Sequence, residues 1–345
     1  MKNRHSGWML YGAYGATGEL ILEEALRRGH RPLLAGRNPS RLSELAAKTG
    51  LDSVAFGVES VAQALPALKG VSLVLNAAGP FFETGGPLRR LCLEARASYV
   101  DVNGEIGDFV AAMDRNTEAW ERRIAIIPGA GYGVVFGEAV AARVASRLAD
   151  ASWLRLSLAT ANALSSRGAS LSTASVLAGG GYVVTRGELR ARPVAHKTWH
   201  VEVDPAQRFA AAPCAEVVAA HRLTGIKEIV AGVPLPLAAA LALRWAGRLV
   251  GAMLLRKSEG AQAKPSPKPG SSEPRSRVWA EAGNAAGKRV TALLETGEGY
   301  THAAMAAVRA VERVLAQRSI GVLTPAQAFG ADFALSLPGT RITDL

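Results

Sequence analysis

Short apolar runs alternate with stretches of helical periodicity along the first 130 residues. The apolar runs are predicted to be buried strands, and they lie at 8–12, 31–36, 71–77, 98–102 and 124–127. Stretches with apolar side chains every three or four residues lie between them, at 19–28, 88–96 and 108–123. Because strands that alternate with helices form parallel sheets, this order predicts an α/β domain with a doubly wound parallel sheet.

The pattern changes after residue 132. Residues 153–160 alternate apolar and polar side chains, which is typical of a strand with one buried face. Further strands are expected at 194–203, 277–283 and 288–296, the last two joined by a hairpin turn at 284–287. We therefore expect a second α+β domain, built on an antiparallel sheet.

One long apolar segment, 235–255, stands apart from both patterns. Its length would suffice to cross a bilayer, but Arg244 and Arg248 interrupt it on one helix face. Each arginine would cost about 2.5–3.5 kcal/mol at the centre of a membrane. Three alternatives remain at this point: a lid or dimer helix over the substrate site, a helix lying on a membrane surface, and a transmembrane helix. The following stretch, 259–276, is rich in Pro, Ser, Gly and Lys and is predicted to be a linker.

A glycine-rich turn follows the first predicted strand. Gly12, Gly15 and Gly18 have the spacing G-x-x-G-x-x-G, and a predicted helix follows them. In a dinucleotide-binding unit one glycine forms the tight turn, another lets the backbone approach the pyrophosphate, and another lets the helix pack closely on the strand. Free N–H groups at the helix N-terminus, here around Ala16 and Thr17, would bind phosphate. The alternative is a glycine-rich turn without a ligand.

The end of the second predicted strand indicates which dinucleotide is bound. A site for NAD usually carries an acid there, which binds the ribose hydroxyls. This chain has no acid at that position: Gly36 leaves room, and Arg37 can place its guanidinium on a 2′-phosphate, with Asn38 and Arg41 beside it. The predicted cofactor is therefore NADP(H). The alternative is that Arg37 is an ordinary surface charge.

The ends of the later strands should lie at the same edge of the sheet. In doubly wound sheets the carboxyl ends of the strands form the ligand crevice. The loop after the strand at 71–77 is expected near the nicotinamide, and it contains Asn76, Ala77, Ala78, Gly79 and Pro80.

Few residues are candidates for proton transfer or for binding the substrate. Tyr132 follows the strand at 124–127 and could donate a proton, or could simply be a packing aromatic. Asp101 and Glu105 either face the substrate or hold their loop by accepting backbone N–H groups. Arg222 could hold an anion. No metal site is expected, because the chain contains no zinc-ligand spacing.

Taken together, these segments resemble the saccharopine dehydrogenase-like oxidoreductases. The matching residues are Tyr11–Gly18, Leu34–Arg37, Asn76–Phe81 with Gly85 and Pro87, Tyr99–Asp101 with Gly104 and Glu105, Pro128 and Gly129 with Gly131 and Tyr132, and Thr324–Ala326 with Ala328–Gly330. The resemblance implies a Rossmann domain, a second α+β domain and a nicotinamide cofactor.

The resemblance also implies the domain boundaries. We expect a dinucleotide-binding domain at 1–132, a second domain at 133–299, and a C-terminal segment, 300–345, that returns to the first domain. Pro269–Ser271 with Arg275 is similar to one branch of the family, the mycobacterial trans-acting enoyl reductases of lipid synthesis. The segment 132–138 departs from many relatives, which carry an acid in the loop after Gly131.

Charge separates the two parts of the chain. The 345 residues carry a formal net charge of +11, and all of it comes from residues 141–345. An anionic partner, such as a carrier protein or a lipid surface, is therefore expected for the second part. Nucleic acid is not expected, because the chain has no nucleic-acid motif or aromatic-interleaved basic stripe. Two cysteines argue against a disulfide scaffold and suit a reducing compartment.

These observations predict an NADPH-dependent oxidoreductase. The expected substrate is a small molecule of the unsaturated or carbonyl type, lipid-like or acyl in character, and a homodimer is compatible with the sequence. The expected location is the cytoplasm, with peripheral membrane contact as an addition. The alternative function is that of a non-catalytic NADP-binding scaffold or sensor at a membrane.

Overall fold

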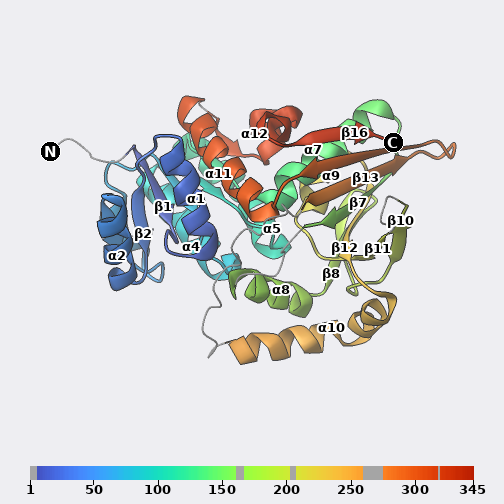
Figure 1. Cartoon of the computed structure of the whole chain (residues 1–345), viewed down its shortest axis with the longest axis horizontal. Coiled ribbons are helices and arrows are strands. Elements are labelled where there is room, and N and C mark those ends of the chain that lie inside the picture. The colour runs from blue at the N-terminus through green and yellow to red at the C-terminus, as the bar shows by residue number, and fades with distance from the viewer. Residues whose placement is uncertain (1–5, 161–166, 203–206, 259–274, 318) are drawn as a thin grey trace. The chain divides into compact units, whose positions relative to one another are not determined.

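The chain folds into two units, described here one at a time. The computed structural model describes residues 6–160, 167–202, 207–258, 275–317 and 319–345. The first unit comprises 1–103, 107–132 and 300–329, and the second comprises 104–106, 133–299 and 330–345 (Figure 1). Within these bounds the statements below refer to the described residues only.

The first unit is built on a seven-stranded sheet whose pairings are all parallel. Its spatial order is β15-β6-β5-β4-β1-β2-β3. This is the order of a doubly wound nucleotide-binding sheet with one strand added, and it confirms the predicted fold class. The strands are β1 (Trp8–Tyr11), β2 (Leu33–Gly36), β3 (Ser53–Ala55), β4 (Leu73–Asn76), β5 (Ser98–Asp101), β6 (Ala125–Ile127) and β15 (Gly321–Val322).

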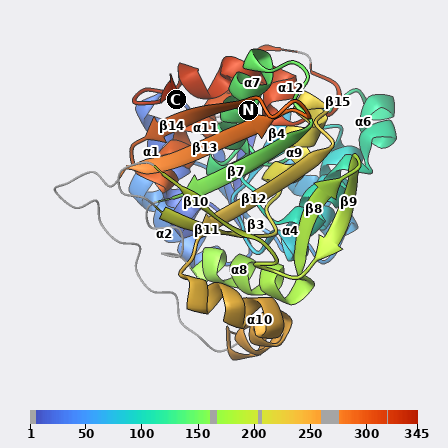
Figure 2. The same cartoon turned by 90° about the vertical axis from the view of Figure 1, so that its right-hand side faces the viewer.

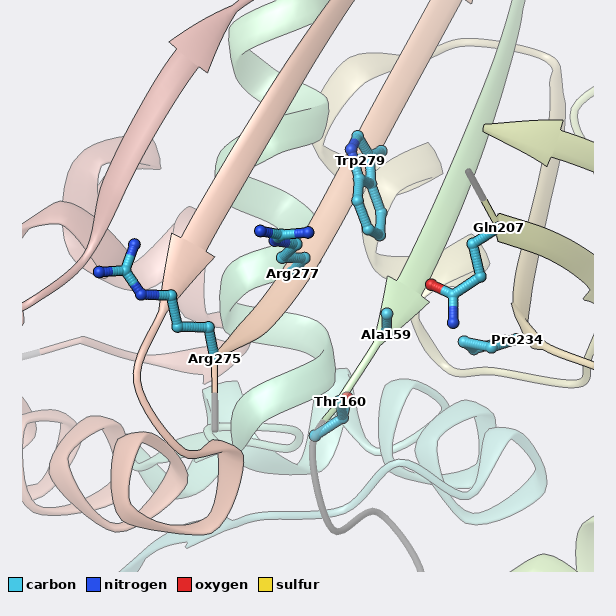
Figure 3. A pocket seen from close by; sticks show the side chains of 7 residues that line it. All are labelled: Ala159, Thr160, Gln207, Pro234, Arg275, Arg277 and Trp279. Atoms are coloured by element: carbon cyan, nitrogen blue, oxygen red, sulfur yellow. The ribbon is translucent and has the colours of Figure 1, made fainter. Parts of the chain in front are cut away.

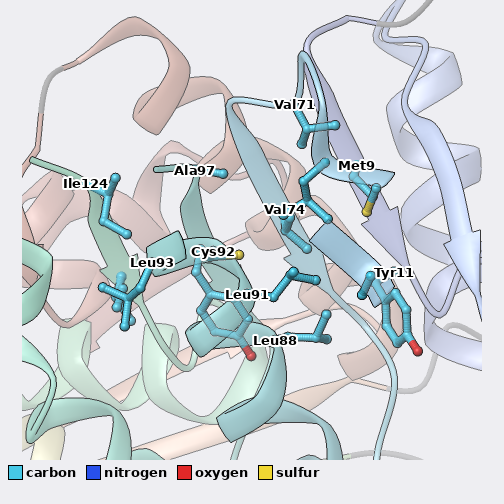
Figure 4. Close-up of a cluster of buried hydrophobic side chains, with 14 of the residues drawn as sticks. Met9, Tyr11, Val71, Val74, Leu88, Leu91, Cys92, Leu93, Ala97 and Ile124 are labelled. Atoms are coloured by element: carbon cyan, nitrogen blue, oxygen red, sulfur yellow. The ribbon is translucent and has the colours of Figure 1, made fainter. Parts of the chain in front are cut away.

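Helices connect these strands and cover the sheet. They are α1 (Ala16–Arg27), α2 (Pro39–Thr49), α3 (Val61–Ala64), α4 (Phe81–Ala95), α5 (Ile106–Met113), α6 (Asn116–Arg122), α11 (Gly299–Ala316) and α12 (Pro325–Phe329), with a 3-10 turn, η1 (Leu65–Leu68). The predicted helix at 108–123 is in fact α5 and α6. Apolar side chains of α4, of β1, β4 and β5, and of the residues just before β4, β5 and β6 form one buried cluster. Figure 4 shows part of it: Met9, Tyr11, Val71, Val74, Leu88, Leu91, Cys92, Leu93, Ala97 and Ile124.

The second unit contains a nine-stranded mixed sheet. The main path runs β10-β11-β12-β7-β13-β14-β16, and β8 joins it by pairing with β12 and β9. Figure 2 shows β12, β7, β13 and β14 side by side. The strands are β7 (Trp153–Ala159), β8 (Gly181–Thr185), β9 (Glu188–Arg192), β10 (Thr198–Val201), β11 (Gln207–Ala211), β12 (Glu228–Pro234), β13 (Ser276–Gly283), β14 (Arg289–Thr296) and β16 (Arg341–Asp344).

Four helices and one 3-10 turn complete the second unit. They are α7 (Tyr132–Arg147), α8 (Arg167–Gly179), α9 (Glu216–Thr224), α10 (Leu237–Ser258) and η2 (Ala331–Ser336). The core of the sheet includes a cluster of aromatic rings, in which Phe209 lies between Trp199 and Trp279. The indole N–H of buried Trp199 donates to the hydroxyl of Ser157 at 2.8 Å, so this polar group is satisfied inside the core.

The second sheet is mainly antiparallel, as predicted, and contains one parallel pair among the described strands: β12 runs parallel to β7, with Ala231 opposite Leu156. One expectation needs correction. The C-terminal segment does not return to the first unit as a whole: residues 330–345 belong to the second unit, where β16 pairs with β14. The predicted linker at 259–276 lies outside the described residues except for its last two positions.

Candidate functional site

The glycine turn after β1 brings three backbone segments together. Gly12 has a φ of +84°, and a Cβ there would lie 2.7 Å from the backbone nitrogen of Ala78, in the loop after β4. A Cβ on Gly18 would lie 2.1 Å from the carbonyl oxygen of Gly12. Only glycine fits at either place, so α1 can pack directly on the turn. These are the close approaches that a dinucleotide-binding turn requires.

The N-terminus of α1 is left open for an anion. Gly15 is the residue before the helix, and no side chain caps the N–H groups that follow it at Ala16 and Thr17. A 12-residue helix places its positive dipole end and these N–H groups at the turn. The backbone of this segment therefore fits the pyrophosphate of a dinucleotide.

The loop after β4 is held from inside by the side chain of Asn76. This fully buried amide donates to the hydroxyls of Tyr99 at 3.1 Å and Thr84 at 3.2 Å, and its oxygen accepts from the N–H of Ala78 at 2.9 Å. All of its polar atoms are engaged, so Asn76 shapes the loop that faces Gly12. The loop ends in a cis peptide bond between Gly79 and Pro80, and α4 begins directly afterwards.

The ring of Tyr14 occupies the space at the end of β2. A Cβ on Gly36 would lie 2.7 Å from this ring, so the room that Gly36 leaves is filled by Tyr14. The phenol oxygen accepts from the N–H of Asn38 at 2.9 Å. Arg41 donates to the carbonyl oxygen of Tyr14 at 2.7 Å, and its guanidinium lies 4.7 Å from the ring centre. The glycine turn and the end of β2 are thereby joined into one surface.

The three predicted phosphate ligands differ in the hydrogen bonds that their side chains already make within the protein. Asn38 uses its side-chain oxygen to cap α2, accepting from the N–H of Arg41 at 3.0 Å. Arg41 is engaged with Tyr14. Arg37 is exposed, and its guanidinium makes no hydrogen bond or salt bridge to any residue that the structure describes. Of the three, Arg37 is the one whose positive charge is available to a phosphate.

A buried polar network lies at the carboxyl end of β5. Arg89 of α4 donates through both terminal nitrogens to Asp108 of α5, at 2.8 and 2.5 Å. Asn103 donates to the same carboxylate at 2.8 Å. Gly85 makes the space for this pair, since a Cβ there would lie 2.4 Å from Asp108. Neither Arg89 nor Asp108 was among the predicted site residues; their place on the apolar faces of helices was the available signal.

Asp101 belongs to the same network and holds its loop. One carboxylate oxygen accepts from the N–H groups of Asn103 at 3.0 Å and Gly129 at 2.8 Å. The other lies 3.9 Å from Arg89. Complete burial and the neighbouring Asp108 raise the pKa of Asp101 to about 6, although Arg89 and the two backbone N–H groups lower it. The loop-fixing alternative fits these contacts.

The other chemistry candidates are placed here one at a time, each within its own unit. Tyr132 ends the first unit, begins α7, and is 8% exposed. Glu105 is buried in the second unit, at the short segment 104–106. Arg222 is exposed in the last turn of α9. The segment 132–138 forms the first turns of α7, and Glu138 is buried there.

The second unit contains a buried acid that the sequence did not reveal. Glu216, at the start of α9, faces α7 where Gly133 and Gly137 leave space, since a Cβ on Gly133 would lie 1.8 Å from its carboxylate. One of its oxygens accepts no hydrogen bond from any described residue. Burial raises the pKa of Glu216 to about 7.

A pocket of about 490 Å³ opens on the mixed sheet (Figure 3). Arg277 and Trp279 reach it from β13, and Gln207 reaches it from β11. Arg275, which is part of the resemblance to the enoyl reductase branch, also lines it; Pro269–Ser271 lie outside the described residues. Arg222 is not among its lining residues, which are Ala159, Thr160, Gln207, Pro234, Arg275, Arg277 and Trp279. The pocket combines apolar surface with two guanidinium groups.

Comparison with known protein families agrees with the geometry of the first unit. Residues 8–125 match the family described as the saccharopine dehydrogenase NADP binding domain. The resemblance to saccharopine dehydrogenase-like proteins is confirmed. The matched range runs from β1 to the start of β6, so it contains the glycine turn, the end of β2 and the loop after β4. The match also supports NADP(H) as the cofactor of this site.

Two relatives carry saccharopine dehydrogenase-like descriptions. A probable mitochondrial saccharopine dehydrogenase-like oxidoreductase from Arabidopsis thaliana is 29% identical over 148 residues, which cover 38% of this chain and 32% of that protein. A saccharopine dehydrogenase-like oxidoreductase from Homo sapiens is 28% identical over 145 residues, covering 36% of this chain and 34% of that protein. The matches thus span about a third of each relative.

A solved structure extends the likeness to both units. Apo saccharopine dehydrogenase (L-Glu forming) from Saccharomyces cerevisiae superposes with a TM-score of 0.66 and covers 98% of this chain and 99% of that one. Its sequence identity is 10%, so the likeness is one of fold. The saccharopine dehydrogenase fold therefore accounts for the mixed sheet that follows the nucleotide-binding unit.

Proposed function

We propose that this chain is an NADPH-dependent oxidoreductase that transfers a hydride to an unsaturated or carbonyl-type substrate of lipid-like character. The glycine turn carries the proposal, because Gly12 and Gly18 leave a backbone cradle that any Cβ would fill. The open N-terminus of α1 supplies the N–H groups that a pyrophosphate needs. The cradle and the family match support the same cofactor.

The chain's own residues would bind and orient the cofactor. The backbone of Gly15, Ala16 and Thr17 would hold the pyrophosphate, and Arg37 would bind the 2′-phosphate of NADPH. The loop of Asn76–Pro80, fixed by the Asn76 amide, would lie beside the nicotinamide. The bound cofactor supplies the hydride, and the protein contributes position, exclusion of water and a partner for the developing charge.

The pocket on the mixed sheet supports a lipid-like substrate with an anionic group. Ala159, Pro234 and an edge of the largely buried Trp279 ring give the pocket its apolar lining. Arg275 adds positive charge, whereas Arg277 donates to Glu295 at 3.3 Å and is already paired. The enoyl reductase branch that the sequence resembles acts in lipid synthesis, which agrees with this chemistry. Tyr132 is the proposed proton donor, and Tyr132→Phe should lower the turnover rate by about tenfold or more while leaving NADPH binding unchanged.

Titration of the purified protein with NADPH and NADH, followed by nicotinamide fluorescence, tests the cofactor. Arg37→Glu should raise the Kd for NADPH by about 100-fold and change the Kd for NADH less than about threefold, because only NADPH carries the 2′-phosphate. Arg31→Glu, also an exposed arginine of the first unit, is the matched control and should leave both constants unchanged. Equal losses for the two cofactors would contradict the phosphate assignment.

A non-catalytic NADP-binding protein at a membrane is the second candidate, favoured by the exposed apolar helix α10. The two candidates differ in turnover. Oxidation of NADPH in the presence of enoyl or carbonyl acceptors supports the enzyme, whereas tight NADPH binding without turnover of any acceptor supports the scaffold or sensor. The proposed cytoplasmic location is tested by fractionating cells that express the chain.

A further inference from the structure

The longest helix of the second unit carries a continuous apolar surface. Leu237, Leu241, Trp245, Leu249 and Met253 of α10 are exposed by 46, 50, 87, 59 and 54%. They are spaced four residues apart, so each lies about 40° further around the helix than the last and they form one slowly turning stripe. We call these five residues the α10 stripe.

Exposure of this kind is concentrated on α10. Among the described residues, fourteen large hydrophobic side chains are exposed, and six of them, including Leu254, belong to this helix. The remaining eight are scattered over other elements, as is normal for a folded surface. A contiguous apolar patch on one element marks an interaction site.

The opposite face of α10 is fixed to the second unit. Small residues at Ala240, Gly247 and Gly251 form the buried side of the helix. A Cβ on Gly251 would lie 2.3 Å from the backbone nitrogen of Ala178, so α10 and α8 touch backbone to backbone. Figures 1 and 2 both show the two helices side by side. The helix is therefore anchored through one face and presents the other to its surroundings.

The charges beside the stripe are all of one sign. The 22 residues of α10 include no Asp or Glu, and Arg244, Arg248 and Arg256 are exposed. The guanidinium of Arg248 lies close to Gly180 at the end of α8, which places it at the border between the anchored face and the stripe. An apolar face bordered by arginines is typical of a helix that lies in the interface of an anionic bilayer.

We propose that α10 docks this chain on the surface of an anionic lipid bilayer, with the α10 stripe inserted among the acyl chains and the arginines on the headgroups. Leu237–Arg256 is long and apolar enough to cross a membrane. A crossing would have to strip α10 from α8 and bury Arg244 and Arg248 at the bilayer centre. A second copy of this chain would bring arginines against arginines, which disfavours a dimer through the same stripe.

Flotation with vesicles tests the docking surface. The full chain is mixed with vesicles of equal parts phosphatidylcholine and phosphatidylglycerol, or of phosphatidylcholine alone. It should float with the anionic vesicles, and added salt should weaken this binding. The variant W245S/L249S should bind at least about tenfold more weakly, because two inserting side chains are lost. The control W120S/L315S, which removes two exposed apolar side chains of the first unit, should bind like the unaltered chain.

Two further variants separate the contribution of the arginine charges from that of the inserted side chains. R244Q/R248Q should lose about tenfold or more in binding to anionic vesicles and little in binding to neutral ones. Trp245→Phe should retain binding but lose most of the fluorescence quenching by lipids brominated on their acyl chains, because Trp245 is the only tryptophan of the α10 stripe. The variant W120F, which removes the exposed tryptophan of the first unit, should keep the quenching. Retained quenching in Trp245→Phe would overturn the proposed insertion.

The proposal is also overturned if the unaltered chain does not float, or if W245S/L249S floats equally well. Sedimentation that shows a dimer abolished by W245S/L249S, without vesicle binding, would assign the stripe to a second copy instead. Every variant is titrated with NADPH as a check on folding. Because none of the residues proposed to bind the cofactor belongs to α10, failure of vesicle binding leaves the NADPH result, and with it the proposed function, unaffected.

Discussion

Two buried carboxylates, one in each unit, have opposite surroundings. Asp108 in the first unit accepts two hydrogen bonds from Arg89 and one from Asn103. Glu216 in the second unit has an oxygen that accepts no hydrogen bond from a described residue, and burial raises its pKa to about 7. Burial of a charge is tolerated when partners replace the lost water, and is costly when they do not. The comparison indicates a fixed scaffold at Asp108 and a titratable group at Glu216.

The largest change in the free energy of unfolding is expected when Asp108 loses its partner Arg89. Arg89→Met should lower the free energy of unfolding by about 3–5 kcal/mol at pH 7, because it leaves Asp108 buried without its main partner. Urea unfolding of the purified variant measures this loss. The double variant R89M/D108N should recover part of it, since it removes the unpaired charge as well. A loss below about 1 kcal/mol would show that the network does not stabilise the first unit.

Replacing Glu216 should raise the free energy of unfolding, whereas replacing Arg89 should lower it. The folded chain holds the Glu216 proton up to about pH 7, whereas the unfolded chain releases it near 4.5, so the stability of the folded state falls as the pH rises through this window. Glu216→Gln removes this dependence and should stabilise the protein by up to about 3 kcal/mol at pH 8, with little effect at pH 4.5.

Urea unfolding between pH 4.5 and 8 measures the response of Glu216→Gln. Glu188→Gln is the matched control, because Glu188 is exposed on β9, and its pH dependence should follow that of the unaltered chain. If the slope of Glu216→Gln with pH equals that of the unaltered chain, Glu216 is not the titrating group.

Glu312 is a third acid, partly exposed and paired with basic side chains, and its replacement should change the free energy of unfolding least. Glu312 of α11 accepts from Arg28 and His30 at 2.7 and 2.9 Å; although burial alone would raise its pKa, these bonds bring it down to about 2. Its contribution is therefore present above about pH 4.5 and is lost as the pH falls toward 2. Glu312→Gln should cost about 1 kcal/mol at pH 7 and nothing near pH 2. Thermal unfolding across this range checks it, and an equal cost at both ends would exclude the ion pair as its source.

The nucleotide-binding turn could be predicted because its determinants are local. Gly12, Gly15 and Gly18 lie within one short segment, and the strand, turn and helix follow one another directly in the sequence. Tyr14 was missed although it lies inside the same motif. Its role depends on packing against Gly36 and Arg41. The pattern of apolar positions along the chain does not predict that the Tyr14 ring contacts these two residues.

The second unit was harder to predict because its order is set by contacts between distant segments. The pattern of 153–160 predicted β7, but not that β12 would join it in parallel across about 75 positions of sequence. The last strand, β16, was assigned to the wrong unit for the same reason. Its partner, β14, is separated from it by a helix that belongs to the first unit. Arg89 and Asp108, on separate helices, likewise meet only in the folded chain.

The ring of Tyr14 limits how the coenzyme preference of this protein can be redesigned. A site that prefers NAD carries an acid at the end of the second strand, where it reaches the ribose hydroxyls. Here the change Gly36→Asp would drive its Cβ to 2.7 Å from the Tyr14 ring. An acid at position 36 therefore requires a second substitution, of Tyr14 by a smaller residue. The phenol–amide bond to Asn38, which that smaller residue would remove, sets the stability cost of any such redesign.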